Sequence, residues 1–243
     1  MYFKKGPSGA PFSYSDNMTR HLAIGDIHGC ITALNTLIDA VELRPDDTII
    51  TLGDYVDRGP DSRAVLNLII GLGETHQLVP LRGNHEIMML DAREKKSWLG
   101  PWLSYGGEAT LRSYGGSFDD VPDAHIAFLE KNLVAYYECE SHIFVHANLA
   151  PDVALADQPD AALFWQKYKD PAPHCSGKTM VCGHTAQHSG MPLSNGHSVC
   201  IDTWAHGEGW LTCLDVGSGT IWQANEAGDT RTMELDAPDS GRG

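Results

Sequence analysis

Five short segments of this chain each follow an apolar run and carry Asp, Asn or His residues just past its end. The segments are GDIHG at 25–29, GDYVDRGP at 53–60, LRGNHE at 81–86, FVHANL at 144–149 and CGHT at 182–185. They supply oxygen and imidazole donors: Asp26, His28, Asp54, Asn84, His146 and His184. Six such donors are about what two divalent cations need if one carboxylate bridges them. The pattern predicts a two-metal site of the kind that hydrolases use.

The spacing of the first three segments supports a common location. Asp54 follows Asp26 by 28 residues and Asn84 follows Asp54 by 30, so each interval fits one helix and one strand. Asp26 and His28 are two residues apart, and on an extended segment they would face the same way. A β-turn with an incidental histidine is the alternative for GDIHG. Taken alone, His146 and His184 would each be read as a core histidine.

The second and third segments also hold charged residues that are not needed as ligands. Arg58 and Arg82 could hold phosphate oxygens, and His85 could donate a proton. Asn84 is a neutral oxygen ligand, which lessens the negative charge of the site and suits an anionic substrate. For Asp57 and Arg58, the alternative is a helix-capping carboxylate and a surface arginine.

Alternating strands and helices must position these segments. Apolar runs at 20–26, 46–54 and 76–84 predict strands, and helical spacing predicts helices over 30–43 and 62–72. Parallel strands of this kind carry their functional loops at one edge of the sheet. Further helices are predicted over 86–98 and 122–137. The second half predicts a mixed sheet with strands at 141–148, 178–184, 197–203, 210–216 and 220–226.

Composition limits the class of protein. With 243 residues, we expect one catalytic domain over 20–226, a flexible extension over 1–19 and a polar tail over 227–243. The net charge of −15 argues against nucleic-acid or anionic-membrane partners. The chain has no secretory h-region, and its six cysteines show no CxxC pair, so we expect free thiols, a cytoplasmic location and a monomer or weak oligomer.

In order and spacing, GDIHG, GDYVDRG and RGNHE resemble the signature of the PPP family of metallophosphoesterases. These are serine/threonine protein phosphatases, with the bis(5′-nucleosyl) tetraphosphatases as relatives, and the resemblance covers about residues 21–216. It implies an α/β fold: a calcineurin-like α/β/β/α sandwich of two mixed sheets flanked by helices. It also implies two divalent metal ions, with Mn²⁺ preferred and Fe, Zn, Co or Ni as alternatives. Asp26 and His28 would hold one ion, Asp54 would bridge, and Asn84, His146 and His184 would complete the second.

The resemblance implies a phosphoprotein phosphatase acting on phosphoserine and phosphothreonine, with some activity on phosphotyrosine and aryl phosphates. A hydroxide held between the metals would attack phosphorus directly. Arg58 and Arg82 would hold the phosphate, and His85, oriented by Asp57, would protonate the leaving group. A symmetrical dinucleoside tetraphosphate hydrolase is the alternative, although no basic set for a second nucleotide is evident. A non-catalytic metal-stabilised binding protein is a third, against which the full set of acid and clamps argues.

The chain departs from the family pattern in the segment 147–183. It contains no arginine there, where many members have a substrate-binding one, so Lys167 or Lys169 could take its place. Asn148 stands where relatives often have glycine and could contact substrate. His206 falls in a loop that often covers the site. The Trp-rich segment 98–105 predicts either a wall of the substrate groove or core packing.

Overall fold

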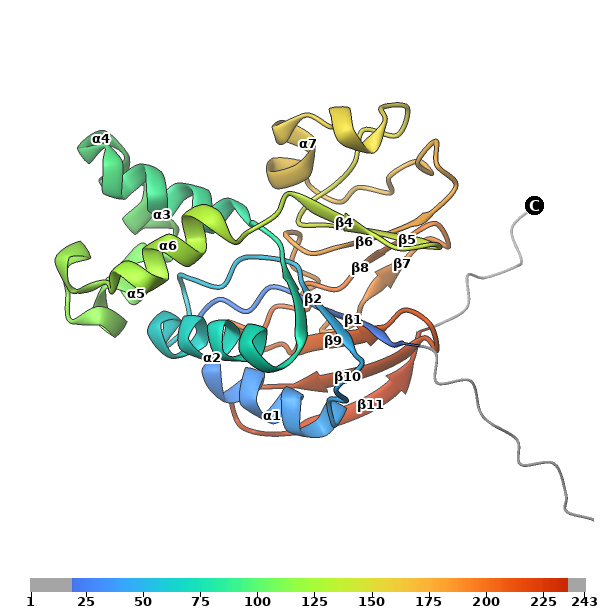
Figure 1. Cartoon of the computed structure of the whole chain (residues 1–243), viewed down its shortest axis with the longest axis horizontal. Coiled ribbons are helices and arrows are strands. Elements are labelled where there is room, and N and C mark those ends of the chain that lie inside the picture. Colours follow the sequence, from blue (N-terminus) through green and yellow to red (C-terminus); the bar gives the residue numbers. More distant parts are fainter. Residues whose placement is uncertain (1–18, 236–243) are drawn as a thin grey trace, which may run out of the picture.

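The computed structural model describes residues 19–235 (Figure 1), and two β-sheets packed face to face form its centre. The first sheet has the strand order β11 (Thr230–Glu234), β10 (Thr220–Ala224), β9 (Leu211–Asp215), β1 (His21–Ile24), β2 (Thr48–Thr51) and β3 (Gln77–Pro80). The second has the order β4 (Tyr136–Glu138), β5 (His142–Val145), β6 (Thr179–Cys182), β8 (Ser198–Cys200) and β7 (Leu193–Ser194). Both sheets combine parallel and antiparallel pairs, as the sequence predicts.

The parallel core of the first sheet confirms the predicted βαβαβ opening. Strand β1 pairs with β2 and β2 with β3, both in parallel, and the connections run through α1 (Ile31–Val41) and α2 (Ser62–Thr75). Helix α2 begins where the Asp61 carboxylate accepts a hydrogen bond from the Ala64 N–H at 2.8 Å. Because parallel strands end at the same edge, the loops after β1, β2 and β3 lie together.

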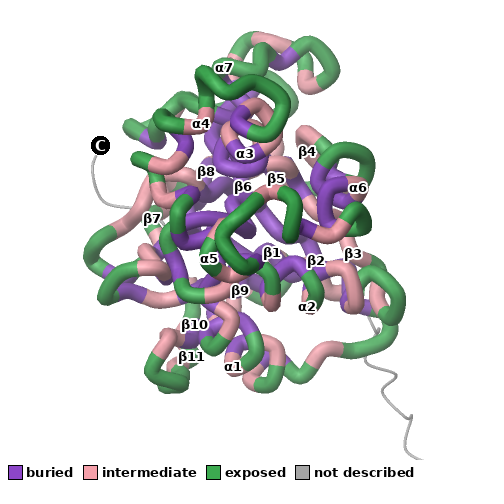
Figure 2. The backbone as a smooth tube through the Cα atoms, turned by 90° about the vertical axis from the view of Figure 1, so that its left-hand side faces the viewer, coloured by how far each residue is buried: buried purple, intermediate pink, exposed green. Residues whose placement is uncertain are grey.

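Alternation along the strands divides the core into three layers. Most of the buried backbone lies in the middle of the molecule (Figure 2). Leu22 and Ile24 of β1 pack with α1 and α2, whereas Ala23 between them faces the second sheet. In β5, Phe144 faces the first sheet, and Ile143 packs on the outer side with α7 (Asp160–Trp165). Apolar side chains on both faces of both sheets therefore require helices outside and sheet-on-sheet packing inside. The predicted α/β/β/α sandwich is confirmed.

A group of helices between β3 and β4 covers one side of the two sheets (Figure 1). It comprises α3 (Asn84–Glu94), α4 (Lys96–Trp102), a π-helical turn (Leu103–Gly107), α5 (Glu108–Tyr114) and α6 (Asp123–Lys131). The helix predicted over 122–137 is too long. It ends at Asn132, and Tyr136 and Tyr137 instead pair with β5, because aromatic residues beside an open sheet edge gain more from strand pairing.

The expected polar tail over 227–243 is wrong in its first part. Residues Thr230–Glu234 form β11, which pairs with β10 along all five residues, so the sheet extends beyond the predicted boundary at 226. Along the sequence TRTME, exposed and half-buried positions alternate, which suits an edge strand with one face in water. Residues 236–243, and all but the last residue of the predicted extension over 1–19, lie outside the described residues.

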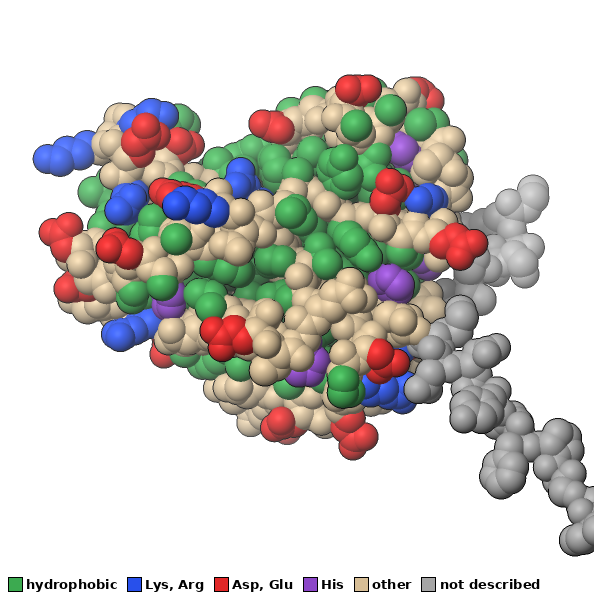
Figure 3. Space-filling view, in the orientation of Figure 1, with side chains coloured by type: hydrophobic (Ala, Val, Ile, Leu, Met, Phe, Trp, Pro, Cys, Tyr) green, Lys and Arg blue, Asp and Glu red, His purple; other side chains and the backbone are tan. Residues whose placement is uncertain are grey.

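Within residues 19–235, no helix has the length and apolar character needed to cross a membrane. All six cysteines are free thiols, as expected, and Cys30, Cys182, Cys200 and Cys213 are buried. On the face that Figure 3 shows, several Lys and Arg side chains gather at the corner formed by α3 and α4, whereas Asp and Glu side chains are spread around the rim.

Candidate dinuclear metal site

The five predicted segments meet above the edge where the strands of both sheets end. Their backbones turn sharply there: of the eight non-glycine residues with positive φ in the described chain, six belong to this region. These are His28, Asp54, Asp57, Arg58, His184 and Trp204. Left-handed backbone is disfavoured for such residues and tends to gather at functional sites. His28 has φ of 47°, so the expectation that Asp26 and His28 share an extended segment is wrong.

Three histidines are held by the backbone in one orientation. The Nδ1 of His28 lies 2.9 Å from the Val56 carbonyl oxygen, and the Nδ1 of His146 lies 2.8 Å from that of Leu52. The Nε2 of His184 lies 3.2 Å from the carbonyl oxygen of Trp165. A carbonyl only accepts, so each ring donates its N–H there and presents the other nitrogen as a bare lone pair.

The electrostatics keep these three imidazoles neutral. Burial is the largest cause in all three: it lowers the pKa of His28, outweighs the Asp54 charge to lower the pKa of His146, and lowers that of His184 to about 3. Neutral imidazole is the form that binds a metal ion. The predicted histidine donors are therefore in the required state before any cation arrives.

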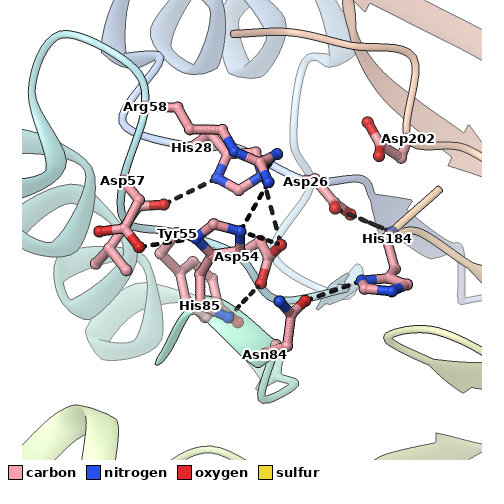
Figure 4. A network of polar contacts seen from close by, with 12 residues as sticks. Asp26, His28, Asp54, Tyr55, Asp57, Arg58, Asn84, His85, His184 and Asp202 are labelled. Carbon is pink, nitrogen blue, oxygen red and sulfur yellow. Dashed lines mark hydrogen bonds and ion pairs between the residues drawn. The ribbon is translucent and has the colours of Figure 1, made fainter. Parts of the chain in front are cut away.

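The bare nitrogens of His146 and His184 face an oxygen rather than a hydrogen-bond donor. The Oδ1 of Asn84 lies 2.9 Å from Nδ1 of His184 (Figure 4) and 2.9 Å from Nε2 of His146, and these three atoms all carry lone pairs. Asp54 lies between the two halves of the site, 3.4 Å from His28 and 3.5 Å from His146. Converging acceptors with no proton between them are what a cation satisfies.

Buried carboxylates add the negative charge that a cation would balance. Burial and the charges of Asp202 and Asp54 raise the pKa of Asp26 well above its usual range. Burial acts in the same direction on Asp54, but the surrounding imidazoles and the His85 N–H outweigh it and hold the pKa of Asp54 below its usual range. The Asp26 carboxylate accepts the His184 N–H, at 2.9 Å for Oδ2. The site therefore collects buried carboxyl groups whose negative charge bound cations would balance.

Two groups of donors within 4.8 Å of one another can hold an ion. One is Asp54, His146 and His184; the other is His28, Asp54 and His85. Asp54 belongs to both, which fits its predicted bridging role. Asp26 lies outside both groups, held by the His184 backbone. The donor set thus fits two divalent cations sharing one carboxylate.

His85 has a different environment from the other histidines. Its Nδ1 lies 2.7 Å from Oδ2 of Asp57, which also accepts the Trp102 indole N–H at 2.8 Å. The second Asp57 oxygen accepts the Thr110 hydroxyl at 2.7 Å. Burial lowers the pKa of His85, but the Asp54 charge and the Asp57 hydrogen bond outweigh it and raise that pKa above its ordinary value. The imidazole is therefore fixed by a buried carboxylate and favours its protonated form.

Arg58 lies across the top of the site. Its Nη1 donates to Nε2 of His28 and its Nη2 to Nε2 of His85, both at 2.9 Å. The fork of the guanidinium therefore spans one predicted metal ligand and the predicted acid. A planar cation at this position can hold the oxygens of a tetrahedral anion bound over the donors.

Similarity to known proteins agrees with this geometry. A family model described as calcineurin-like phosphoesterase matches residues 19–206. The chain belongs to the calcineurin-like phosphoesterase family. The predicted resemblance to the metallophosphoesterases is confirmed, and two divalent metal ions are the cofactors that the family implies for the donors described above.

Two kinds of curated relative match this phosphoesterase. Serine/threonine-protein phosphatase 1 of Salmonella typhimurium is 31% identical over 156 residues, which cover 62% of this chain and 65% of that protein. A symmetrical bis(5′-nucleosyl)-tetraphosphatase of Pseudomonas syringae is 29% identical over 137 residues, which cover 55% of this chain and 43% of that protein. The match therefore spans less than two thirds of either relative.

Solved structures share the fold at low identity. A putative diadenosine tetraphosphatase superposes with a TM-score of 0.63 at 20% identity, covering 91% of this chain and 96% of that chain. A cold-active protein-tyrosine phosphatase of a Shewanella species gives 0.61 at 16% identity, covering 90% and 81%. These likenesses show the sandwich fold of the phosphoesterase and leave its substrate open.

Glu86 is a site residue to which the sequence analysis gave no role. Its fully buried carboxylate accepts the backbone N–H groups of Asp54 at 2.9 Å, Tyr55 at 2.8 Å and Gly83 at 2.9 Å. Burial and the Asp54 charge raise the pKa of Glu86 to about 8, while the N–H donors favour its ionised form. Glu86 thereby joins the loops that carry Asp54 and Asn84. The capping pattern of Gly83 followed three residues later by Glu86 is the signal that could have revealed it.

The structure does not bring Arg82 to the site as a phosphate clamp. Its Nη2 donates to the carbonyl oxygen of Glu130 on α6 at 3.4 Å, and its buried Nε has no hydrogen-bond partner within the described residues. Arg82 follows β3 as predicted, but its side chain turns toward the helical group. Of the two predicted arginines, Arg58 alone lines the cavity described next.

A cavity of about 630 Å³ opens over the donors. Asp54, Asn84, His85 and His184 form part of its lining, together with Arg58. The other lining residues are mainly aromatic or apolar: Met88, Trp98, Pro101, Trp102, Tyr105, Trp165, Lys167, Ala186, His188, Trp204 and His206. Both interpretations of the segment 98–105 hold, because Trp102 is buried in the core whereas Trp98 and Tyr105 are exposed at the cavity.

The four weaker sequence candidates differ in whether they line the cavity. Lys167 lines the cavity, and its Nζ donates to the carbonyl oxygen of His184 at 3.0 Å, whereas Lys169 is exposed outside the lining. His206 lines the cavity with its ring centroid 4.8 Å from that of His28. Asn148 is buried beneath, with its amide donating to the Lys167 carbonyl at 3.3 Å, so its position favours support of Lys167 over substrate contact.

Proposed function

We propose that this protein is a metal-dependent phosphomonoesterase that removes phosphate from phosphorylated protein side chains, phosphoserine and phosphothreonine among them. One observation carries the proposal: an imidazole held by a buried carboxylate lies beside the double donor cluster and under an arginine fork. His85, Asp57 and Arg58 form this group. A protein that only stored metal would need the donors but neither the acid nor the clamp. The match to a serine/threonine phosphatase over 62% of the chain supports it.

The chemistry requires divalent cations at the two donor groups, where they would activate water and neutralise charge on the phosphoryl group. The Arg58 guanidinium would hold phosphoryl oxygens while the oxygen of water bonds to phosphorus and the ester P–O bond breaks. Once Arg58 turns from Nε2 of His85 to the phosphoryl oxygens, that nitrogen could carry the proton that the leaving oxygen takes, since Nδ1 is committed to Asp57. The products are an alcohol and inorganic phosphate.

The cavity argues for a monoester over a tetraphosphate chain. Among its lining residues, Arg58 and Lys167 are the Arg and Lys side chains. Two such cations with bound metals suit one phosphate dianion. A dinucleoside tetraphosphate carries about four phosphate charges and would call for a longer row of cations.

We also propose Mn²⁺ as the working metal and the cytoplasm as the location. Oxygen and imidazole donors without thiolate favour a metal of intermediate hardness, for which Mn²⁺ is suited. Six free thiols fit a reducing compartment. Metal analysis of the protein as purified, followed by reloading with Mn, Fe, Zn, Co or Ni, tests the first point.

The deciding experiment compares phosphate release from a phosphoserine peptide with cleavage of a dinucleoside tetraphosphate by the Mn²⁺-loaded protein. Release from the peptide at a higher kcat/KM supports the proposal, and the reverse preference would replace it with the tetraphosphatase function. Inactivity on both would indicate a binding protein. His85→Asn should retain both metals and lose most turnover, whereas Asp54→Asn should lose metal as well. Loss of metal from His85→Asn would show that His85 is a ligand, as its place in one donor group allows.

A further inference from the structure

Besides the buried Trp102, four aromatic residues line the cavity beside the metal donors: Trp98, Tyr105, Trp165 and Trp204. We propose that they form a slot for a flat aromatic group attached directly to the phosphate. The protein would then prefer aryl phosphate monoesters, phosphotyrosine above all, over alkyl ones. This inference rests on the proposed phosphomonoesterase function and names the leaving group that the site selects.

Tyr105 is tied directly to the phosphate clamp. It precedes Gly106, whose carbonyl oxygen accepts the Arg58 N–H at 3.1 Å. A Cβ on Gly106 would lie only 2.7 Å from Cγ of Arg58, so the π-helical turn and the arginine are in close contact. The backbone of Tyr105 is therefore held next to the Arg58 loop, and Tyr105 lines the same cavity as Arg58.

Trp165 is tied to the other half of the site. Its carbonyl oxygen accepts from Nε2 of His184 at 3.2 Å, and its indole lines the same cavity. Helix α7 ends at this residue, so the last turn of α7 places the indole next to a predicted metal ligand.

Trp204 lines a third side of the cavity. Its φ of 67° is unusual for a residue with a large side chain. The indole meets the ring of His188 edge-on at 4.4 Å, and His206 lies between it and His28. Three separate segments thus contribute aromatic residues to the cavity that Arg58, His184 and His206 also line.

The exposure of these rings points to a ligand. Trp98 is 48% exposed, Tyr105 58% and Trp165 44%, which is high for side chains of this size. Exposed aromatic surface at the mouth of a polar site is typical of ligand recognition, because rings stack on flat groups with little loss of side-chain entropy. The charged lining at Asp54, Arg58 and His85 shows that the ligand also carries a compact anion.

The same arrangement favours a ring on the phosphate itself over a nucleobase at the end of a nucleotide. The backbone carbonyls of Gly106, which follows Tyr105, and of Trp165 each accept one hydrogen bond from a clamp or ligand residue, so both aromatic residues line the cavity at the level of Arg58 and His184. An aryl ring bonded directly to a phosphate oxygen would lie beside Tyr105 and Trp165. A base separated from the phosphate by a ribose extends farther.

Binding can be measured without turnover by calorimetry of the Mn²⁺-loaded protein with phenylphosphonate, methylphosphonate and AMP. We expect phenylphosphonate to bind at least about tenfold more tightly than methylphosphonate, the ratio that one good stacking contact gives. Trp165→Ala and Trp98→Ala should each reduce that ratio about three- to tenfold while leaving methylphosphonate affinity within about twofold. Leu193→Ala is the matched control, since Leu193 is 47% exposed on β7 and outside the cavity lining.

Equal affinity for the two phosphonates, or variants that behave like Leu193→Ala, would overturn the slot. Tighter binding of AMP than of phenylphosphonate would overturn the aryl assignment in favour of a nucleobase. Paired peptides that differ only in phosphotyrosine or phosphoserine separate this inference from the proposed function. Hydrolysis of both at equal KM would keep the phosphatase and reject the slot. Hydrolysis of neither would reject the phosphatase, while the phosphonate ratio would still report on the slot.

Discussion

The carbonyl oxygen of Gly106 lies 3.1 Å from the Arg58 nitrogen, and no side chain fits between the two residues. A Cβ on Gly106 would approach Cγ and N of Arg58 to 2.7 and 2.9 Å. Because Gly106 has no side chain, the π-helical turn packs directly against the loop that carries Arg58. Arg58 itself has φ of 70°, so its conformation depends on such support from outside its own loop.

We therefore expect Gly106→Ala to displace Arg58 and to lower kcat/KM by about tenfold or more, the effect of losing one charge-assisted contact to phosphate. Gly116→Ala is the matched control. Gly116 has the same φ of 112° but open space around its Cα, so both variants carry the backbone strain of about 1–2 kcal/mol and only one disturbs the clamp. Steady-state kinetics with thermal unfolding distinguish the two, and equal activities would contradict this role for Gly106.

Asp57→Asn should uncouple the orientation of His85 from metal binding. The variant keeps one amide oxygen but loses the negative charge beside the His85 Nδ1–H that favours the protonated imidazole, so kcat on an alkyl phosphate should fall by about 10²–10³. An aryl phosphate with an acidic phenol needs little protonation and should lose much less. Metal content should stay at the wild-type level, since Asp57 is in neither donor group. A uniform loss on both substrates would argue against His85 as the acid.

Glu86→Gln should weaken metal binding without touching a ligand. The carboxylate of Glu86 collects the N–H groups of Asp54, Tyr55 and Gly83, and an amide can accept at only one of its two ends. Loosening the bridging loop should reduce metal affinity about 10–100-fold, as loss of an outer-shell partner does. The Mn²⁺ concentration for half-maximal activity measures the change. Glu94→Gln at the exposed end of α3 serves as the control, and its curve should match the wild type.

Much of this arrangement is predictable from local pattern. Asp54 and Asn84 follow strands β2 and β3, whose apolar runs and spacing fix a parallel sheet edge, so their meeting follows from topology. The roles of Glu86 and Arg82 do not follow, although both lie in the same segment as Asn84. The Glu86 carboxylate accepts hydrogen bonds from backbone N–H groups, whereas Arg82 donates a hydrogen bond to a backbone carbonyl of α6. Which way a side chain leaves a loop depends on tertiary partners far away in sequence.

The same limit explains the errors at segment ends. The run at 122–137 has one helical period, but the edge of β5 captures Tyr136 and Tyr137 as a strand. Strand β11 carries few apolar residues and forms because β10 offers an unpaired edge. Neither edge exists until the distant strands have assembled, so a local pattern could not reveal them.

Lys167 should substitute in part for the absent arginine. Its Nζ, held by the His184 carbonyl, is at the cavity, so Lys167→Met should raise KM for a phosphopeptide about three- to tenfold with kcat less affected. Lys169→Met removes the same charge two residues away, outside the lining, and should leave KM within about twofold. If both variants raise KM alike, the effect is long-range charge and Lys167 has no contact role.

A final prediction concerns stability at the far side of the first sheet, where Arg20 meets Asp47. The Arg20 Nε donates to Oδ1 of Asp47 at 2.8 Å, and the Arg44 N–H donates to Oδ2 at 2.7 Å. Burial raises the pKa of Asp47, but these donors outweigh it and lower the pKa below its usual range. A carboxyl whose pKa is lower in the folded state than in the unfolded one stabilises the fold when ionised. The stabilisation by the Asp47 carboxylate is complete above the unfolded pKa of about 4 and disappears as the pH falls through the folded value.

Asp47→Asn should therefore cost about 1–3 kcal/mol in the free energy of unfolding at pH 7, and the difference in this free energy from the wild type should narrow below about pH 4. Urea unfolding of the metal-free protein across this range measures the difference, with Asp39→Asn on the exposed face of α1 as the control. A difference that stays constant as the pH falls would show that Asp47 stabilises the fold through its shape and hydrogen bonds, independently of its charge.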